Sequence, residues 1–236
     1  MAAALPSREQ GLALDKRAAL AAVLRSSPFG DKVGTASGER GPASSAWPSS
    51  ALLAEVVPGG LRRGQVVSVP GSAQLLLELV GGASAAGAWC ALVGQPALAR
   101  AGRAAAACGV VLERWLLVPE PGPHWAESVA ALIGAVDVVV AAPTGPVPAA
   151  LVGRLAARAR QHGTVLIAFG TTWPGSDLEI RAEGSRWRGV ADGRGELAGR
   201  EQDVVAVTKG SRPRHMVIGS ANPPSQGRGG LRLVGS

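Results

Sequence analysis

Lysine is almost absent from this chain, although the chain is strongly basic. Lys16, Lys32 and Lys209 are the only lysines among 24 basic residues, so the net charge of +7 and the isoelectric point of about 10.9 come almost entirely from arginine. Guanidinium groups bind phosphate oxygens well. However, an alanine-rich chain without tyrosine is also typical of GC-rich coding, which favours arginine over lysine. The charge therefore leaves weak nucleic-acid contact open without indicating it by itself.

Cysteine and histidine are also scarce. Cys90 and Cys108 form no CxxC pair, which excludes a disulfide framework and a cysteine-based zinc site, and both are expected to be reduced thiols. His124, His162 and His215 lie far apart in the sequence, so none has the spacing of metal ligands. We expect no metal and no cofactor.

Long apolar runs are missing as well. The first residues, MAAALPSREQG, contain no basic region followed by an apolar stretch, so no signal peptide is expected. Glycine, proline or charge interrupts every apolar run before the ~20 residues that a bilayer requires. These absences predict a cytoplasmic protein without membrane contact.

What is present is a regular alternation of strands and helices from Ala51 onward. Apolar runs predict strands at 66–69, 88–93, 110–118, 136–142 and 164–169, with helices between them at 72–86, 96–108, 123–134 and 148–162. This rhythm is typical of a mainly parallel sheet with helices on both faces. After Gly170 the helices stop, and strands at 177–188, 203–209 and 213–219 predict an antiparallel C-terminal extension.

The remaining segments suggest four parts. Residues 1–27 contain an amphipathic helix, and residues 28–50 are rich in glycine, serine and proline and read as a flexible linker. Residues 51–219 form the α/β core, and residues 220–236 have the composition of a flexible tail.

Lysine is also missing from a segment that otherwise resembles the start of a phosphate-binding loop. Gly64–Val80, GQVVSVPGSAQLLLELV, has the strand–turn–helix pattern in which GxxxxGK[ST] holds a nucleotide phosphate. The turn is shortened to Pro70, Gly71 and Ser72, and it contains neither the lysine nor the full glycine spacing. The segment predicts the architecture of a nucleotide site without its chemistry.

The order of these motifs resembles the core of RecA-type recombinases. Leu61–Val69 is similar to the lead into their phosphate loop, Val136–Val140 (VDVVV) to their Walker B strand, and Thr164–Gly170 to the apolar strand that ends in their DNA-responsive residue. The antiparallel strands after Asp177 match the end of that core. The resemblance implies a RecA-like three-layer fold for about residues 51–219.

When the catalytic motifs of that family are matched to this sequence residue by residue, all of their functional residues are absent. The strand similar to Walker B ends in Ala142-Pro143 instead of a metal-binding acid, and Gly94–Ala97 lacks the catalytic glutamate. The sensing glutamine falls at Gly170, and Asp137 stands at the start of its strand, where a structural role is expected. Since a magnesium nucleotide needs lysine, metal ligands and backbone donors together, we expect a pseudo-ATPase with no catalytic residue.

RecA-like cores of this size without ATPase motifs resemble the actinobacterial ImuA-prime proteins. That resemblance implies an accessory role in DNA damage-induced translesion synthesis and mutagenesis, with association with the nucleoid after damage. The implied partners are ImuB, an inactive Y-family polymerase homologue, and an error-prone C-family DNA polymerase, bound directly or through ImuB. An alternative is an ATP-independent protein of DNA repair that binds single-stranded DNA, and self-association also stays open.

Contact surfaces are the functional sites that this interpretation predicts. Trp173 occupies the place of a DNA-binding loop, where it could stack on a base or anchor a protein interface. Because this loop is much shorter than a DNA-binding loop, we expect Trp173 to belong to a protein interface. Trp187 lies on a late strand, and the late basic cluster includes Lys209, Arg212 and Arg214. The candidate interaction residues are Leu20, Val23, Leu24, Trp173, Trp187, Arg212, Arg214, Leu231 and Leu233.

Overall fold

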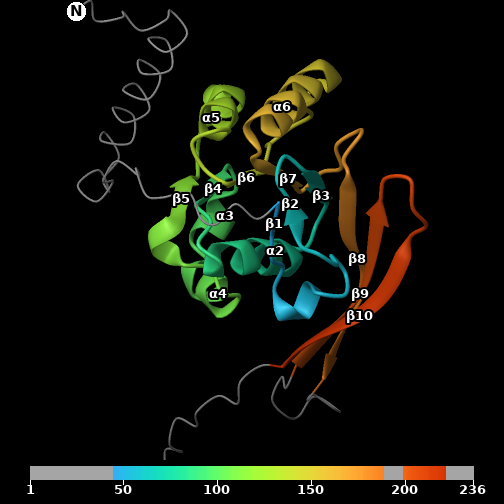
Figure 1. Cartoon of the computed structure of the whole chain (residues 1–236). Helices are drawn as coiled ribbons and strands as arrows, with labels where there is room; N and C mark the ends of the chain where they lie inside the picture. Colours follow the sequence, from blue (N-terminus) through green and yellow to red (C-terminus); the bar gives the residue numbers. More distant parts are fainter. Residues whose placement is uncertain (1–44, 189–198, 222–236) are drawn as a thin grey trace, which may run out of the picture. The chain divides into compact units, whose positions relative to one another are not determined.

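The computed structural model describes residues 45–188 and 199–221, all of which belong to one compact unit, Ser44–Ser236. Its centre is an eight-stranded sheet in the order β10-β9-β8-β3-β7-β6-β4-β5 (Figure 1). The strands β3, β4, β5, β6 and β7 are parallel, and β8 also pairs in parallel with β3. The expected α/β class with a mainly parallel sheet is confirmed.

The elements follow the alternation that the sequence predicts. The strands are β1 (Ala46–Trp47), β2 (Leu61–Arg62), β3 (Val66–Val69), β4 (Cys90–Val93), β5 (Trp115–Val118), β6 (Val138–Ala141), β7 (Val165–Phe169), β8 (Leu178–Arg188), β9 (Gly199–Thr208) and β10 (Arg214–Ala221). The α-helices are α2 (Ala73–Ala85), α3 (Pro96–Ala99), α4 (Gly102–Ala107), α5 (Trp125–Leu132) and α6 (Ala149–His162). Short 3₁₀ turns are η2 (Ala51–Leu53), η3 (Leu112–Arg114) and η4 (Gly122–His124).

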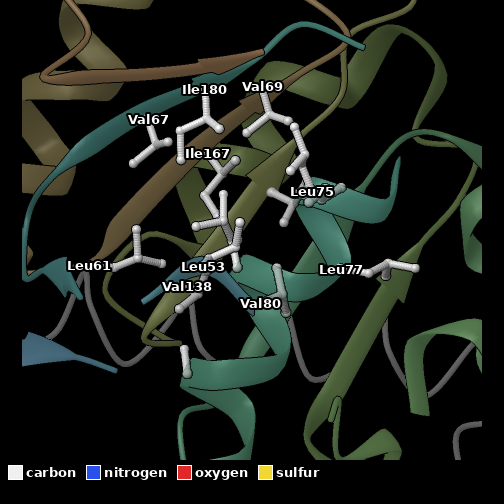
Figure 2. Packing of buried hydrophobic residues seen from close by; sticks show 14 of the residues in the cluster. Leu53, Leu61, Val67, Val69, Leu75, Leu77, Val80, Val138, Ile167 and Ile180 are labelled. Atoms are coloured by element: carbon white, nitrogen blue, oxygen red, sulfur yellow. The ribbon is translucent and has the colours of Figure 1, made fainter. Parts of the chain in front are cut away.

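Alternating side chains of the parallel strands form two apolar cores, one on each face of the sheet. Val67, Ile167 and Val140 lie in register on neighbouring strands and belong to one apolar cluster with residues of the helix α2. Figure 2 shows Val67 and Ile167 in this cluster. Their neighbours Leu166 and Val139 point to the other face, where α5 and α6 cover them. Successive strand residues face opposite sides, so apolar runs without polar alternation produce a sheet buried on both faces.

Two adjacent glycines allow α2 to sit deep in the first core. A Cβ at Gly81 would collide with the Cys108 carbonyl, and a Cβ at Gly82 would collide with the backbone of Ser49 and Ser50. A glycine in a helix interior weakens the helix relative to alanine. The structure adds that the two positions permit backbone contacts that a larger residue would block.

The three strands after Gly170 are antiparallel to one another. β8 pairs with β9 and β9 pairs with β10, with an irregularity in register between Ala182 and Gly184. β8 starts beside β3 and then runs beyond it, since only Leu178 and Glu179 pair with that strand. The antiparallel strands therefore extend past the carboxyl-terminal edge of the parallel strands.

The expected boundaries are wrong in several places. The strand expected at 110–118 is confined to β5 and follows the turn η3, and β9 begins at Gly199 instead of at 203. The linker was assigned to residues 28–50, but β1 pairs with β2 and the Trp47 side chain is 3% exposed within the core. Trp47 belongs to the main apolar core, and the Arg63 guanidinium lies over its ring at 4.7 Å. The helix expected at 96–108 is divided into α3 and α4, and Gly102, a poor helix former, begins the second piece.

The expected N-terminal amphipathic helix, most of the linker and the C-terminal tail lie outside the described residues. The same applies to Leu20, Val23, Leu24, Leu231 and Leu233. No helix among the described residues is both long and apolar enough to cross a membrane.

Candidate functional site

The segment that resembles a phosphate loop follows β3, and its serine has a structural partner on each side. Ser72 is the N-cap of α2, where its Oγ accepts a hydrogen bond from the Leu75 N–H at 3.3 Å. The same oxygen lies 3.5 Å from Nε2 of Gln202, a β9 side chain that is 1% exposed. A serine cap satisfies one of the free N–H groups of a helix start. Ser72 therefore ties α2 to the antiparallel strands.

Asp137, the acid at the start of β6, also holds the backbone together. Its Oδ2 accepts a hydrogen bond from the Trp89 N–H at 3.0 Å, and its Oδ1 lies 3.4 Å from the Arg63 guanidinium. These contacts join the starts of β4 and β6 to the residue after β2. This is the structural role expected for Asp137, at the opposite edge of the sheet from Ser72.

The residues after β4 approach the end of β6 closely. Gly94 has φ +93°, and a Cβ there would collide with the Ala142 carbonyl oxygen. The next residue, Gln95, has φ +59°, the one positive value among the described non-glycine residues. The loop that the resemblance matches to the catalytic glutamate is thus held by backbone contact, and it places an amide side chain there.

Trp173 is not a contact residue, contrary to the sequence-based assignment. Its side chain is 2% exposed, packs in the core under α5 and α6, and meets the Trp125 ring edge-to-face with centroids 6.5 Å apart. Its backbone N–H donates to Oγ of the buried Ser68 at 3.0 Å. The loop after β7 folds inward because burying an indole removes a large apolar area from water. Trp173 can therefore neither stack on a base nor anchor a partner in this structure.

Trp187 lies on the surface of β8, as a contact residue must. It is 54% exposed, and the Arg200 guanidinium of β9 stacks over its ring at 5.2 Å. Val217 of β10 is also exposed, at 59%. The antiparallel strands therefore display apolar side chains at a sheet edge.

A pocket of about 530 Å³ lies at the other end of the strands, and Arg62–Gln65, part of the segment that resembles the lead into a phosphate loop, contribute to its lining. Its cationic lining residues are Arg62, Arg63, Arg160, Lys209 and Arg214, and its other lining residues are Val56, Val57, Pro58, Gly60, Gly64, Gln65, Asp177, Leu178 and Thr208. They come from the loop before β3, the end of α6 and the adjoining ends of β8, β9 and β10. Five segments distant in sequence therefore form one basic pocket.

The sequence identified only part of this pocket. Lys209 and Arg214 were grouped as a basic cluster, and the structure places both in the lining. Arg212 is exposed in the turn before β10 and is not among the lining residues. Arg62 and Arg160 were missed, because only strand order and helix length bring them beside the cluster.

The two cysteines have high pKa values. Burial, and then the negative charge of Asp137, raises the pKa of Cys90 well above that of an ordinary thiol. Burial and a nearby Glu78 raise the pKa of Cys108 to about 11. No group of three or more histidine, cysteine, aspartate or glutamate side chains among the described residues is arranged to hold a metal ion.

Two comparisons with known proteins match this core. The uncharacterized protein Rv3395c of Mycobacterium tuberculosis (strain ATCC 25618 / H37Rv) is 35% identical over 147 residues, which are 56% of this chain and 71% of that protein. The family model of the MT3502 N-terminal domain matches residues 55–175, which run from just after η2 through β3 and Asp137 to the loop of Trp173. On this extent of similarity, the chain belongs to the family of the MT3502 N-terminal domain.

Proposed function

We propose that this protein is a non-catalytic, RecA-like accessory protein of DNA damage-induced translesion synthesis. It acts as a scaffold for a mutasome that contains an ImuB-type polymerase homologue and an error-prone C-family DNA polymerase. The observation that carries the proposal is the double role of Ser72, which caps α2 and contacts the buried Gln202. Because Ser72 makes two contacts within the protein, it supports a structural role for this segment and not a role in nucleotide chemistry.

The arrangement of the strands supports the RecA-like part of the proposal. β3, β7 and β6, which carry the three motifs of the resemblance, are neighbours in the sheet and run parallel. The loops after these strands therefore meet at one edge, where ligands bind in open α/β sheets. The relative found in a mycobacterium is consistent with an actinobacterial family.

Three residues at positions that the resemblance matches to catalytic motifs support a pseudo-ATPase. Ser72 is a helix cap, Gly94 is in backbone contact with Ala142, and the surviving acid, Asp137, binds backbone at the far edge. A magnesium nucleotide needs several charged groups acting together. Restoring such a site would require changes on at least three strands.

Co-purification tests the scaffold. The full-length chain is co-expressed with an ImuB-type protein and with a C-family polymerase, together and singly, and captured complexes are identified. We expect capture of the ImuB-type protein, and of the polymerase directly or through it. Absence of both from the captured material overturns the proposal.

A pair of surface variants then tests where the partner binds. Trp187→Ala removes an exposed ring from the antiparallel strands, and Leu112→Ala removes a side chain that is 47% exposed at the β5 end of the sheet. If the antiparallel strands bind the partner, only Trp187→Ala lowers capture, since the two changes affect opposite ends of the sheet. Equal loss in both variants contradicts this location.

The alternative function is ATP-independent binding of single-stranded DNA, and the basic pocket is the observation that favours it. If binding of single-stranded DNA is the main function of the protein, it must persist at physiological salt and occur without capture of a polymerase component. That combination of results selects the alternative over the scaffold.

A further inference from the structure

The strand β10 is one of the two outer strands of the eight-stranded sheet, and among the described residues no strand pairs with its outer side (Figure 1). Its inner side pairs with β9 from Arg214 to Ala221 in unbroken register. The outer side of such a strand presents N–H and C=O groups that are a template for pairing with another strand. The other outer strand, β5, has four residues, against eight in β10. β10 is therefore the longer open edge of the sheet.

β10 has few of the features that prevent pairing at an edge. Proteins usually protect an exposed edge with charged residues, proline or a β-bulge. In β10, Arg214 and His215 are the only charged or titratable residues, and both stand at its start. The segment Met216–Ala221 contains neither charge nor proline, and its pairing with β9 contains no bulge. Most of the strand is therefore open to a further strand.

The side chains of β10 divide between the two faces of the sheet. Ile218 is 5% exposed and lies in the main apolar core, and Met216 packs against that core. Successive strand residues face opposite sides, so Val217 lies on the other face, together with His215 and Gly219. Val217 is 59% exposed, the highest value among the large hydrophobic side chains of the described residues. An exposed apolar side chain therefore stands near the middle of the open edge.

The distribution of charge along β10 favours pairing with an antiparallel copy of the same strand. A parallel copy would place Arg214 beside Arg214 of the other strand, and like charges opposite each other destabilise a strand pair. An antiparallel copy places the two charged starts at opposite ends of the pair. The strand is therefore compatible with itself in the antiparallel orientation, which a two-fold axis produces.

One register suits both faces of the joined sheet. In an antiparallel pair, directly opposite residues lie on the same face. With Val217 opposite Val217 of the second copy, Met216 lies opposite Ile218, and His215 lies opposite Gly219. The two exposed valines then cover each other, and the residues that face the core stay on the core side of the sheet.

The same register keeps the arginines of the two copies apart. Arg214 lies opposite Ser220 of the second copy, and Ser220 pairs with Arg200 on its own β9. The Arg200 guanidinium stacks over the Trp187 ring of β8, which is on the side of β9 away from β10. No two guanidinium groups are therefore directly opposite each other.

We infer that two copies of this chain associate by antiparallel pairing of their β10 strands, with a two-fold axis at Val217. The pairing forms about six to eight backbone hydrogen bonds and joins the two sheets into one. The contact is confined to two strand edges and their side chains, so it belongs to the small, transient class of interfaces. The inference does not rest on the scaffold, whose proposed contact residue, Trp187, lies two strands away.

Analytical ultracentrifugation of the full-length protein from about 1 to 200 µM tests the association. We expect a reversible equilibrium between the 23.7 kDa chain and its dimer. Val217→Lys places two ammonium groups opposite each other and is expected to weaken the dimer more than about 10-fold. Wild-type protein that stays monomeric over the whole range overturns the inference.

The matched control is Leu117→Lys, which adds the same charge to β5, the other outer strand, at a side chain that is 41% exposed. This control is expected to associate like the wild-type protein. Loss of the dimer in Leu117→Lys alone assigns the contact to β5, and equal loss in both variants means that only net charge matters. Either result overturns the inference.

A charge pair separates the contact from misfolding. Val217→Glu is also expected to be monomeric by itself, because two carboxylates then meet at the axis. An equal mixture of Val217→Lys and Val217→Glu should restore a dimer with one copy of each, since opposite charges stabilise a cross-strand pair. If both variants melt like the wild-type protein and their mixture stays monomeric, the inference is wrong.

Disulfide trapping tests the register. Opposite Cα atoms of antiparallel strands lie about 4.5–5.5 Å apart, a distance that a disulfide spans. Under mild oxidation Val217→Cys should therefore give a cross-linked dimer. His215→Cys should not, because its two copies stand about 13 Å apart along the strands. Wild-type protein oxidised in parallel controls for Cys90 and Cys108.

Equal cross-linking of the two cysteine variants excludes an axis at Val217 and overturns the inference. None of these measurements includes a polymerase component. Failure here therefore leaves the scaffold proposal to its own test.

Discussion

Replacing Asp137 tests whether the last acid of the Walker B-like strand is structural or catalytic. Its Oδ2 is the acceptor for the Trp89 N–H at 3.0 Å, and the carboxylate is 14% exposed. Leaving a donor of this kind without an acceptor costs about 1–3 kcal/mol. Losing a partly exposed ion pair with Arg63 adds about 0–1 kcal/mol. We expect Asp137→Ala to lower the free energy of unfolding by about 2 kcal/mol.

Asp137→Asn separates the two contributions. The amide retains an oxygen that accepts from Trp89 but carries no charge for Arg63. We therefore expect a loss below about 1 kcal/mol, while the surface control Glu113→Ala should have almost no effect. The assay is urea unfolding followed by tryptophan fluorescence, for which the chain supplies six tryptophans.

Two results would refute this reasoning. One is an unchanged urea midpoint for Asp137→Ala, which would mean that the Trp89 hydrogen bond contributes nothing. The other is measurable Mg-ATP hydrolysis that Asp137→Asn abolishes although the variant remains folded. The second result would also overturn the pseudo-ATPase proposal.

Four further predictions follow from the same contacts. Ser72→Ala removes the N-cap of α2 and should cost about 1 kcal/mol in urea unfolding, and ATPase activity lost with it would contradict the structural assignment. Trp173→Ala should cost about 3–5 kcal/mol, whereas Trp187→Ala should change stability by less than about 0.5 kcal/mol; equal losses would show that the burial of the two rings is misassigned. Gly94→Ala should prevent stable folding, because its Cβ would strike a carbonyl oxygen, and a normal melting curve would exclude that contact. Cys108, whose pKa is raised from 9.0 to about 11, contributes stability that is full below pH 9 and is lost as pH rises through 11; thiol titration at pH 8 should be slow in the native protein and fast in urea, and equally fast reaction in both would contradict this.

Much of the core could be predicted because its signals are local. Each parallel strand is a short apolar run, and Gly or Pro marks most of its limits, so periodicity identifies it without reference to other strands. The strand β1 was missed because its signal is not local. Trp47 stands in a glycine- and serine-rich segment, and it becomes part of the core through pairing with β2 and packing in the main apolar cluster.

The candidate site residues also divide into features that the sequence could predict and features that it could not. The missing lysine and acids could be read directly from the sequence, but the environment of a side chain could not. Trp173 and Trp187 look alike in the sequence, and one is 2% exposed whereas the other is 54% exposed. The difference arises because the loop after β7 packs in the core with α5 and α6, while Trp187 lies on the part of β8 that continues beyond β3.

By itself, the sequence determined the α/β class, the order of the elements of the parallel sheet and the absence of lysine from Gly64–Val80. Apolar periodicity and residue identity are properties of neighbouring positions, so they require no knowledge of the fold. Only the tertiary structure decided that Ser72 is bound by Gln202, that Trp173 is buried, and that Arg62 joins Lys209 and Arg214 in one pocket. Those facts depend on contacts between residues far apart in the chain, which the sheet order creates when β3 is placed between β7 and β8.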